Sequence, residues 1–520
     1  MLAALIRKEL LAHVLSLRFA VGAVFTLALF VASALVLTAD YRGRVEAFQA
    51  ASAAHRKEVA EARVFSQIRI ETDRPPAPLS VLCQGVDRSL PASSAFSITD
   101  PPTLDGAGAS RNPLLVVFPG LDLAVVVQVV MSLLALLFAH DTISGERARG
   151  TLPLTLANRV PRATVLAGKY LGGMAVLLPL LALGMGVSLV LVAGSPLVHF
   201  TAGDWVAAAA IFGVSAAYLS LVFLLGMVVS VLTARPGTSL VAALFAWVVL
   251  VLLAPPAASS LAAALRPLPS ARERAEAEKH ADDAFFGAMI DYAHTHPLPL
   301  TYPQQRFNVE RQSLYSGGVP YLGRLYSAPR EYVEWALDGN RHAIPLRLEA
   351  AAKIGDVRRG AVRRMTVQAR LARLLRTVSP ASCYADAVTL VAGTDEGRYV
   401  RFREAVARYR EAFLAYARTN GGLDYRFFTR EAALHMPSLA DLERLEAAGD
   451  RARLAAILGT GFSADPPLDL SGMPAFTMAR RGPLTRLTDA ALQLAVLALL
   501  NLTLLLVAAL AFARADVRVR

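Results

Sequence analysis

The sequence lacks the features that would support catalysis by a soluble enzyme. Its 520 residues include only two cysteines, which rules out a four-cysteine zinc site and a scaffold of several disulfides. It contains no Gly-x-x-x-x-Gly-Lys-Ser/Thr phosphate loop, no Gly-x-Ser-x-Gly elbow and no His-Glu-x-x-His pair. We therefore expect a non-catalytic chain that hydrolyses no ATP and holds no cofactor or metal of its own.

The basic charge of the chain does not indicate a nucleic-acid partner. The formal net charge is +12, but the Lys and Arg residues are dispersed among acidic ones. No groove-reading or base-stacking motif accompanies them. We expect no nucleic acid to bind, and attribute the charge to membrane topology and to solvated helix surfaces.

Charged residues are also missing from the centres of six long apolar stretches. Hydrophobic residues make up 55% of the chain and the mean hydropathy is +0.45, which is typical of a membrane protein. Each stretch has about the 20 residues that a helix needs to cross a bilayer. Carriers driven by protons or sodium need ionisable groups near the midplane, so that class is disfavoured. The stretches are 19–39, 121–139, 170–193, 205–232, 239–258 and 490–513.

Lysine and arginine in the short connections predict that both termini are cytoplasmic, because these residues resist translocation. The short loop 194–204 on the other side contains neither. Only Arg480, Arg481 and Arg486, ahead of the last stretch, disagree with this orientation. The basic residues assigned to the cytoplasm are Arg7, Lys8, Arg18, Arg147, Arg149, Arg159, Arg162, Lys169, Arg235, Arg514, Arg518 and Arg520.

This topology divides the chain into membrane and extracytoplasmic parts. Residues 1–39 hold an interfacial helix and the first span, 119–258 hold spans two to five with a cytoplasmic loop at 141–169, and 488–520 hold the last span and a tail. The segments 40–118 and 259–487 then lie outside the cytoplasm, and the second is large enough to be a domain. We expect an all-α membrane protein with six transmembrane helices and a mainly helical extracytoplasmic domain.

Helical patterns recur in the segment 259–487. Ser438 and Asp441 are spaced as a capping box ahead of one helix. Two others are expected over 271–293 and 346–378, the latter ending at Ser379-Pro380. Apolar residues at spacings of three and four predict one more, before a stop at Asn420-Gly421: Phe402, Val406, Tyr409, Phe413 and Tyr416.

Residues 1–16 are predicted to form an amphipathic helix at the inner membrane surface. Leu2, Leu5, Leu10 and Val14 fall near one face, and Arg7, Lys8 and Glu9 fall elsewhere. The alternative is that these residues simply extend the first span.

The most informative stretch is the connection from Asp141 to Gly173, DTISGERARGTLPLTLANRVPRATVLAGKYLGG. It resembles the signature of ABC-2 type permeases, in which a small residue, a Glu, Gly-Thr-Leu, a short apolar helix, an Arg and a Gly-Lys pair lead into the next span. Arg7-Lys8-Glu9-Leu10 also resembles that family's interfacial entry helix. The matching positions in the loop are Ser144, Glu146, Gly150, Thr151, Leu152, Arg162, Gly168 and Lys169.

This resemblance implies the transmembrane subunit of a type V ABC exporter in a bacterial inner membrane. Such permeases work in pairs, as homodimers or heterodimers, with separate ABC ATP-binding subunits that hold the ATP and Mg. The first hypothesis is a subunit that exports a solute. The alternative is a mechanotransmitter that acts on an envelope protein through its outer domain and moves no solute. A third possibility is a membrane anchor that presents a helical receptor.

The loop has the chemistry expected of a contact with an ATPase. Glu146 and Arg147 can pair with a partner surface, while Leu152, Leu154 and Leu156 offer an apolar face. The alternative is an ordinary loop whose charges only set the orientation of the spans.

A second and looser resemblance begins at Ser379. The Ser-Pro pair there, followed by Ala392-Gly393-Thr394, is similar to a pattern near the end of the large insertion in some of these permeases. No such parallel covers residues 271–375.

The two cysteines, Cys83 and Cys383, fall in the two outer segments. Either a disulfide joins them, closing a loop of about 300 residues, or both are buried free thiols. A local group of His and Asp residues is interpreted as solvated charge rather than a metal site. Its members are His280, Asp282, Asp283, Asp291, His294 and His296.

Overall fold

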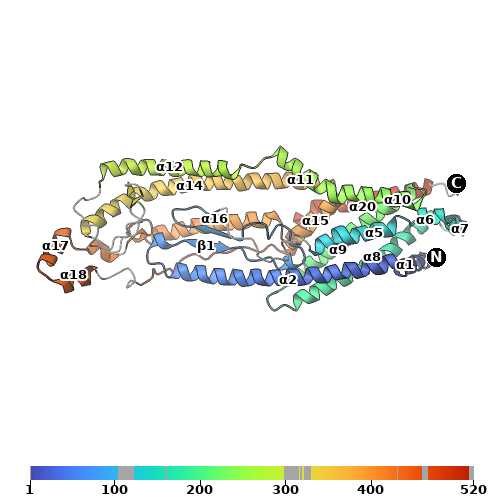
Figure 1. Cartoon of the computed structure of the whole chain (residues 1–520), viewed down its shortest axis with the longest axis horizontal. Helices are drawn as coiled ribbons and strands as arrows, with labels where there is room; N and C mark the ends of the chain where they lie inside the picture. Colours follow the sequence, from blue (N-terminus) through green and yellow to red (C-terminus); the bar gives the residue numbers. More distant parts are fainter. Residues whose placement is uncertain are drawn as a thin grey trace.

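The computed structural model of the chain is elongated, with six long apolar helices at one end and a largely helical domain extending from them (Figure 1). It describes residues 2–103, 122–157, 161–297, 315–316, 319–320, 329–429, 431–458 and 466–514. α1 and the C-terminal end of α20 lie at the free end of the bundle, which we call the terminal end. The described residues within 40–103 and 266–489 form the distal domain on the opposite side. Arg159, Arg518 and Arg520, which entered the topology argument, lie outside the described residues.

The N-terminal part of the chain folds as two helices. α1 (Leu2–Val14) ends before Ser16, whose hydroxyl oxygen accepts a hydrogen bond from Phe19 N and caps α2 (Leu17–Ala60). The amphipathic helix is thus a separate element and does not extend the first span. α2 instead continues at its other end, past the predicted limit at residue 39 and into the distal domain.

The remaining spans coincide with the predicted apolar stretches, so the expected set of six membrane helices is confirmed by length and composition. Two of these spans contain a π-helical stretch, in which the backbone is locally wider than an α-helix. The second span consists of α4 (Leu123–Val125), η3 (Val126–Met131) and α5 (Ser132–Ala139). The third, fourth and sixth are α8 (Arg162–Ala193), α9 (Ala202–Leu232) and α20 (Ala491–Arg514), and the fifth consists of α10 (Pro236–Trp247), η4 (Val248–Leu253) and α11 (Ala254–Leu265).

The six spans differ in how far they are enclosed. In α9, 78% of the most apolar window is buried, compared with 11% in α20 and 17% in the fifth span. α9 is therefore the central helix of the bundle. The last two spans present most of their apolar surface outward, as helices in contact with lipid or with another protein do.

Helices also dominate the distal domain. The long helices α12 (Ala271–Thr295) and α14 (Arg330–Arg376) pack side by side along one edge, with α16 (Glu396–Thr419) between them and α2 (Figure 1). α17 (Leu439–Ala447) and α18 (Arg451–Leu458) lie at the tip. Shorter elements are α15 (Pro380–Ala392), α19 (Pro483–Asp489) and the 3-10 turns η1 (Phe65–Gln67), η2 (Pro78–Val81), η5 (Tyr425–Phe427) and η6 (Glu431–His435).

The helix signals in the distal domain are confirmed, with changes at the ends. α16 ends at Thr419 with Asn420 as its C-cap, and Gly421 follows with a φ of +74°, a left-handed conformation that suits glycine. The Ser438 hydroxyl accepts from Asp441 N at the start of α17. α14 begins at Arg330, well before the predicted start, and continues through Pro345.

The few strands were not predicted. β1 (Ile70–Asp73) pairs antiparallel with β2 (Ser93–Phe96), with Ile70 opposite Phe96. All four residues of β2 are buried, so the alternation by which a strand is identified in a sequence is absent. The other pair, β3 (Tyr315–Ser316) with β4 (Val319–Pro320), is shorter still.

α15 anchors the distal domain in the bundle. The Ser-Pro and Ala-Gly-Thr patterns noted in the sequence lie at the two ends of this helix. Ser379 accepts from Ser382 N as the N-cap and donates to the carbonyl of Leu250, in the π-helical stretch η4, at 2.5 Å. At the other end Gly393 takes a left-handed conformation, with φ +70°. The buried ring of Tyr384 stacks on Tyr218 of α9, with 4.7 Å between ring centroids.

Two of the three arginines that disagree with the predicted topology, Arg481 and Arg486, are partly neutralised where the distal domain meets the bundle. Arg481 pairs with Asp489, and Arg486 lies 3.6 Å from Asp204. Arg486 Nε also donates to the carbonyl of Arg481. An arginine held in this way carries less weight as a topology signal than a free one.

Candidate functional site at the terminal end of the bundle

Two short helices form the loop between the second and third spans. α6 (Ser144–Ala148) is separated from α7 (Thr151–Ala157) by a turn at Gly150, where φ is +71°. A side chain at this position would strain the backbone. The glycine of the Gly-Thr-Leu motif is therefore needed to turn the chain between the two helices.

Four charged side chains meet where α1, α6 and α8 converge. Lys169 Nζ lies 2.9 Å from Glu9 Oε1 and 3.0 Å from Glu146 Oε1. Lys8 Nζ lies 2.9 Å from the same oxygen of Glu146. The two positive and two negative charges balance. The balance matters because the Lys169 side chain is only 3% exposed. We call Lys8, Glu9, Glu146 and Lys169 the charge cluster.

Glycines on α8 let α1 come close enough to form this cluster. A Cβ placed on Gly168 would lie 2.9 Å from Leu5 Cβ, and one on Gly172 would lie 2.6 Å from Glu9 Cβ. Both distances are shorter than ordinary contacts between side chains. The Gly-Lys pair of the motif therefore combines close helix packing with a buried positive charge.

The loop is also fastened to the end of α9. The Ser144 and Ser230 hydroxyls are 3.1 Å apart, and Ser230 Oγ accepts from the backbone amides of Ile143 and Ser144. Arg147 Nη1 donates to the carbonyl of Thr233 at 2.9 Å, just beyond the last residue of α9. A guanidinium in this place satisfies carbonyls that the helix end leaves free and offsets its negative dipole end.

A further contact joins the loop to the last span. Arg162 Nη1 donates to the carbonyls of Phe512 and Ala513, near the C-terminal end of α20, at 2.9 and 2.7 Å. The motif residues thus connect α1, α8, α9 and α20 to a single loop. Motion of the loop would be transmitted to several membrane helices at once.

Within α7 the apolar residues divide between the core and the surface. Leu152 is buried in the hydrophobic core of the bundle, whereas Leu154 is 68% exposed. The side chain of Leu156 lies outside the described residues. Of the two α7 leucines whose side chains the structure describes, Leu154 is therefore the one that an approaching protein can reach.

The structure brings together all the expected loop and entry-helix residues except Arg7, which is exposed on α1. The sequence predicts that Glu146 and Arg147 can pair with a partner surface; in the structure both side chains make contacts within the chain. Thr151 holds the turn, with its hydroxyl 3.3 Å from the carbonyl of Glu146. Ser230 was not anticipated, because a serine at the end of an apolar span is not distinctive in a sequence.

The two cysteines are free, buried thiols in the structure. Burial raises the pKa of Cys83 well above its ordinary value and that of Cys383 to about 11. Of the His and Asp group in α12, Asp282 pairs with Arg347 of α14. Across the parts of the chain that the structure describes, no three His, Cys, Asp or Glu side chains gather as a metal site.

The chain matches the model of a known protein family. A family model described as "ABC-2 family transporter protein" matches residues 3–517, nearly the whole chain. No protein of curated function matches the sequence.

Proposed function

The chain belongs to the ABC-2 family of transporter proteins, and on that premise we propose that it is the permease subunit of an ATP-driven exporter. ATP and Mg would be bound by a separate ABC ATP-binding subunit. The observation that carries the proposal is the loop Asp141–Lys169. It presents an exposed apolar residue on α7, while its charged residues fasten it to α1 and to three membrane helices, α8, α9 and α20.

The loop would act as a mechanical joint. An ATPase that closes on ATP would push on α7, with Leu154 as an apolar anchor in a groove of the partner. The charge cluster would pass the displacement to α1 and α8, and Arg147 and Arg162 would pass it to α9 and α20. In this mechanism Glu146 and Arg147 set the orientation of the loop rather than contact the partner.

This function places the terminal end in the cytoplasm and the distal domain on the outer side of a bacterial inner membrane. A second permease subunit would pack on the bundle, as a homodimer or a heterodimer. The outward apolar surfaces of α10, α11 and α20 suit contact with that subunit and with lipid.

The test replaces an exposed leucine in α7 by aspartate. Leu154→Asp should lower the ATPase turnover of the complex reconstituted in lipid, because it puts a charge on an apolar contact. Leu232→Asp is the matched control, since Leu232 is also 68% exposed at the same end but is the last residue of α9 and lies outside the loop. Equal turnover in Leu154→Asp and the unmodified complex would contradict the coupling role, as would an equal loss in both variants.

The chain by itself should not hydrolyse ATP. ATP hydrolysis that stays with the purified chain after every other ATPase has been removed would contradict the assignment of catalysis to a partner.

A mechanotransmitter is the second candidate, and α2 favours it. The same unbroken helix crosses the bundle and extends along the distal domain, so movement of the first span would directly reshape that domain. Stimulation of the complex's ATPase by a purified solute would favour export. A stable complex with an envelope protein, with no such stimulation, would favour mechanotransmission.

A further inference from the structure

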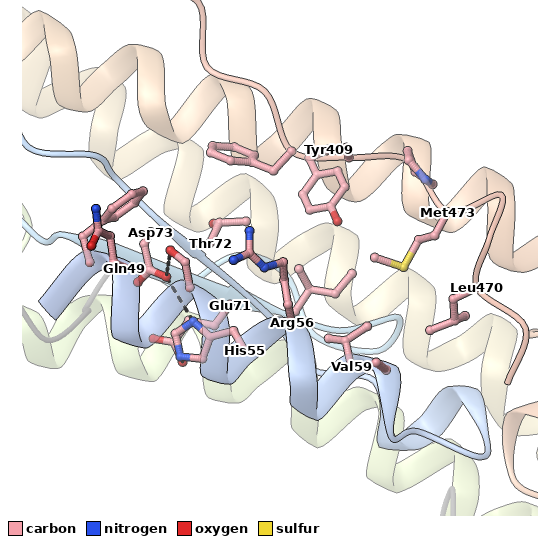
Figure 2. Close-up of a pocket in the computed structure, with 17 residues that line it drawn as sticks. Gln49, His55, Arg56, Val59, Glu71, Thr72, Asp73, Tyr409, Leu470 and Met473 are labelled. Atoms are coloured by element: carbon pink, nitrogen blue, oxygen red, sulfur yellow. Dashed lines mark hydrogen bonds and ion pairs between the residues drawn. The ribbon is translucent and has the colours of Figure 1, made fainter. Parts of the chain in front are cut away.

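The distal domain contains a large cavity between α2 and the chain that leads to the last span. Its volume is about 760 Å³, within the range of small-molecule sites. Its floor is formed by one face of α2 and by all four residues of β1 (Figure 2). α16 contributes Tyr409, and the segment 470–476 closes the remaining side.

Most of the cavity wall is apolar. Phe48 and Val59 come from α2, Ile70 from β1, and Leu470, Met473 and Phe476 from the closing segment. A ligand that removes this apolar surface from water would be stabilised by the hydrophobic effect. The wall therefore suits a ligand with a sizeable apolar body.

The acidic groups of the cavity already have donors. His55 lies between the two carboxylates, with Nδ1 3.1 Å from Asp73 and Nε2 3.4 Å from Glu71. Ser52 also donates to Asp73, and Ser93 donates to Glu71. These carboxylates have little capacity left for a cationic ligand.

Arg56 and Tyr409 bring side-chain donors to the cavity that have no acceptor among the described residues, although Arg56 is also exposed to solvent. Arg56 extends from α2 across the cavity toward Thr72, and the hydroxyl of Tyr409 points into the same space from the opposite wall (Figure 2). Burial raises the pKa of Tyr409, so its hydroxyl stays protonated and able to donate. Lys57, the next residue along α2, instead lies 3.8 Å from Glu61 and does not line the cavity.

We propose that this cavity binds an amphipathic monoanion, namely a carboxylate with an apolar chain. Arg56 would hold the carboxylate through paired N–H donors, with Tyr409 as the second donor. The apolar chain would lie against Met473 and Phe476. A single negative charge fits better than a doubly charged phosphate, because Glu71 and Asp73 lie nearby and would repel additional charge.

The site does not depend on the proposed ATPase coupling. It is formed by the distal domain alone, and its occupancy can be measured without ATP or a partner chain.

Binding can be tested on the full chain in nanodiscs of phosphatidylcholine, with empty nanodiscs as background. The probe is a dansyl-labelled undecanoate, displaced by decanoate, decanol or decyltrimethylammonium. We expect displacement by decanoate at a concentration at least about tenfold lower than by the other two, since only the carboxylate forms charge-assisted hydrogen bonds. Equal displacement by all three compounds would overturn the proposal, because it would indicate apolar partitioning alone.

Matched variants locate the site. Arg56→Gln should weaken decanoate binding about tenfold or more, and Tyr409→Phe by a smaller factor of about three. Lys57→Gln removes the same charge one residue away and should leave the affinity unchanged. Unchanged binding in Arg56→Gln, or an equal loss in Lys57→Gln, would contradict the assignment, and an unchanged melting temperature verifies that each variant is folded.

Discussion

The charge cluster at the terminal end and the cavity in the distal domain differ in how their polar side chains are paired. In the cluster every charge meets an opposite charge, and α8 glycines allow the helices to close around it. In the cavity the carboxylates are satisfied, while Arg56 and the Tyr409 hydroxyl have no partner among the described residues. A balanced group holds helices together, whereas donors that have no protein acceptor beside an apolar wall leave room for a ligand.

The largest effect should follow from unbalancing the cluster. Lys169→Met leaves two carboxylates and one exposed lysine, and breaking a buried pair in this way costs about 3–5 kcal/mol. The melting temperature of the purified chain should fall accordingly. The double variant Lys169→Met/Glu9→Gln restores the balance and should recover part of the loss; no recovery would show that charge balance is not what stabilises this joint.

Crowding the contact between α1 and α8 should have the next largest effect. Gly172→Ala places a methyl group 2.6 Å from Glu9 Cβ, and overpacking of this kind costs about 1–3 kcal/mol. Gly186→Ala is the control on the same helix, because nothing lies within 4 Å of the added methyl group. Denaturation in detergent should separate the two variants, and equal stability would contradict the close approach of α1.

A substitution in the cavity should cost much less stability than one in the charge cluster. Arg56→Gln should change the unfolding free energy by no more than about 0.5 kcal/mol, as is usual for exposed positions. A loss comparable with that of Lys169→Met would mean that Arg56 stabilises the fold, and the open donor would lose its significance. The measurement is the same thermal unfolding.

The two cysteine thiols should not react with a labelling reagent until the protein unfolds. Their burial and raised pKa predict that neither thiol reacts with maleimide in the folded chain at pH 7.4. Denatured but unreduced protein should then label at two positions. No labelling under those conditions would show that Cys83 and Cys383 are bridged.

The membrane helices could be predicted because long runs without charge leave few alternatives. The helix stops at Ser379-Pro380 and Asn420-Gly421 also followed from local signals. The four residues of the charge cluster could be identified as candidates from the sequence, but in two separate groups. Lys8 and Glu9 belong to the entry helix, and Glu146 and Lys169 belong to the loop. Their pairing joins residues 138 to 160 positions apart, and no local pattern records a contact over that separation.

The cavity was not foreseen for a related reason. Its walls include a four-residue strand and the irregular segment 470–476, neither of which has a repeating apolar pattern. Arg56 and the neighbouring Lys57 are both basic residues of α2, but Arg56 lines the cavity and Lys57 does not. Which of the two side chains reaches the cavity depends on the packing around the helix.

The continuity of α2 has a further consequence. At 1.5 Å per residue its 44 residues measure about 66 Å, and residues near its far end line the cavity. A tilt of about 5° around its base would carry the far end through about 6 Å, over a helix of that length. α2 is therefore a lever: a small change of angle within the bilayer becomes a displacement comparable with the width of a side chain at the cavity, and a ligand held there would resist that swing.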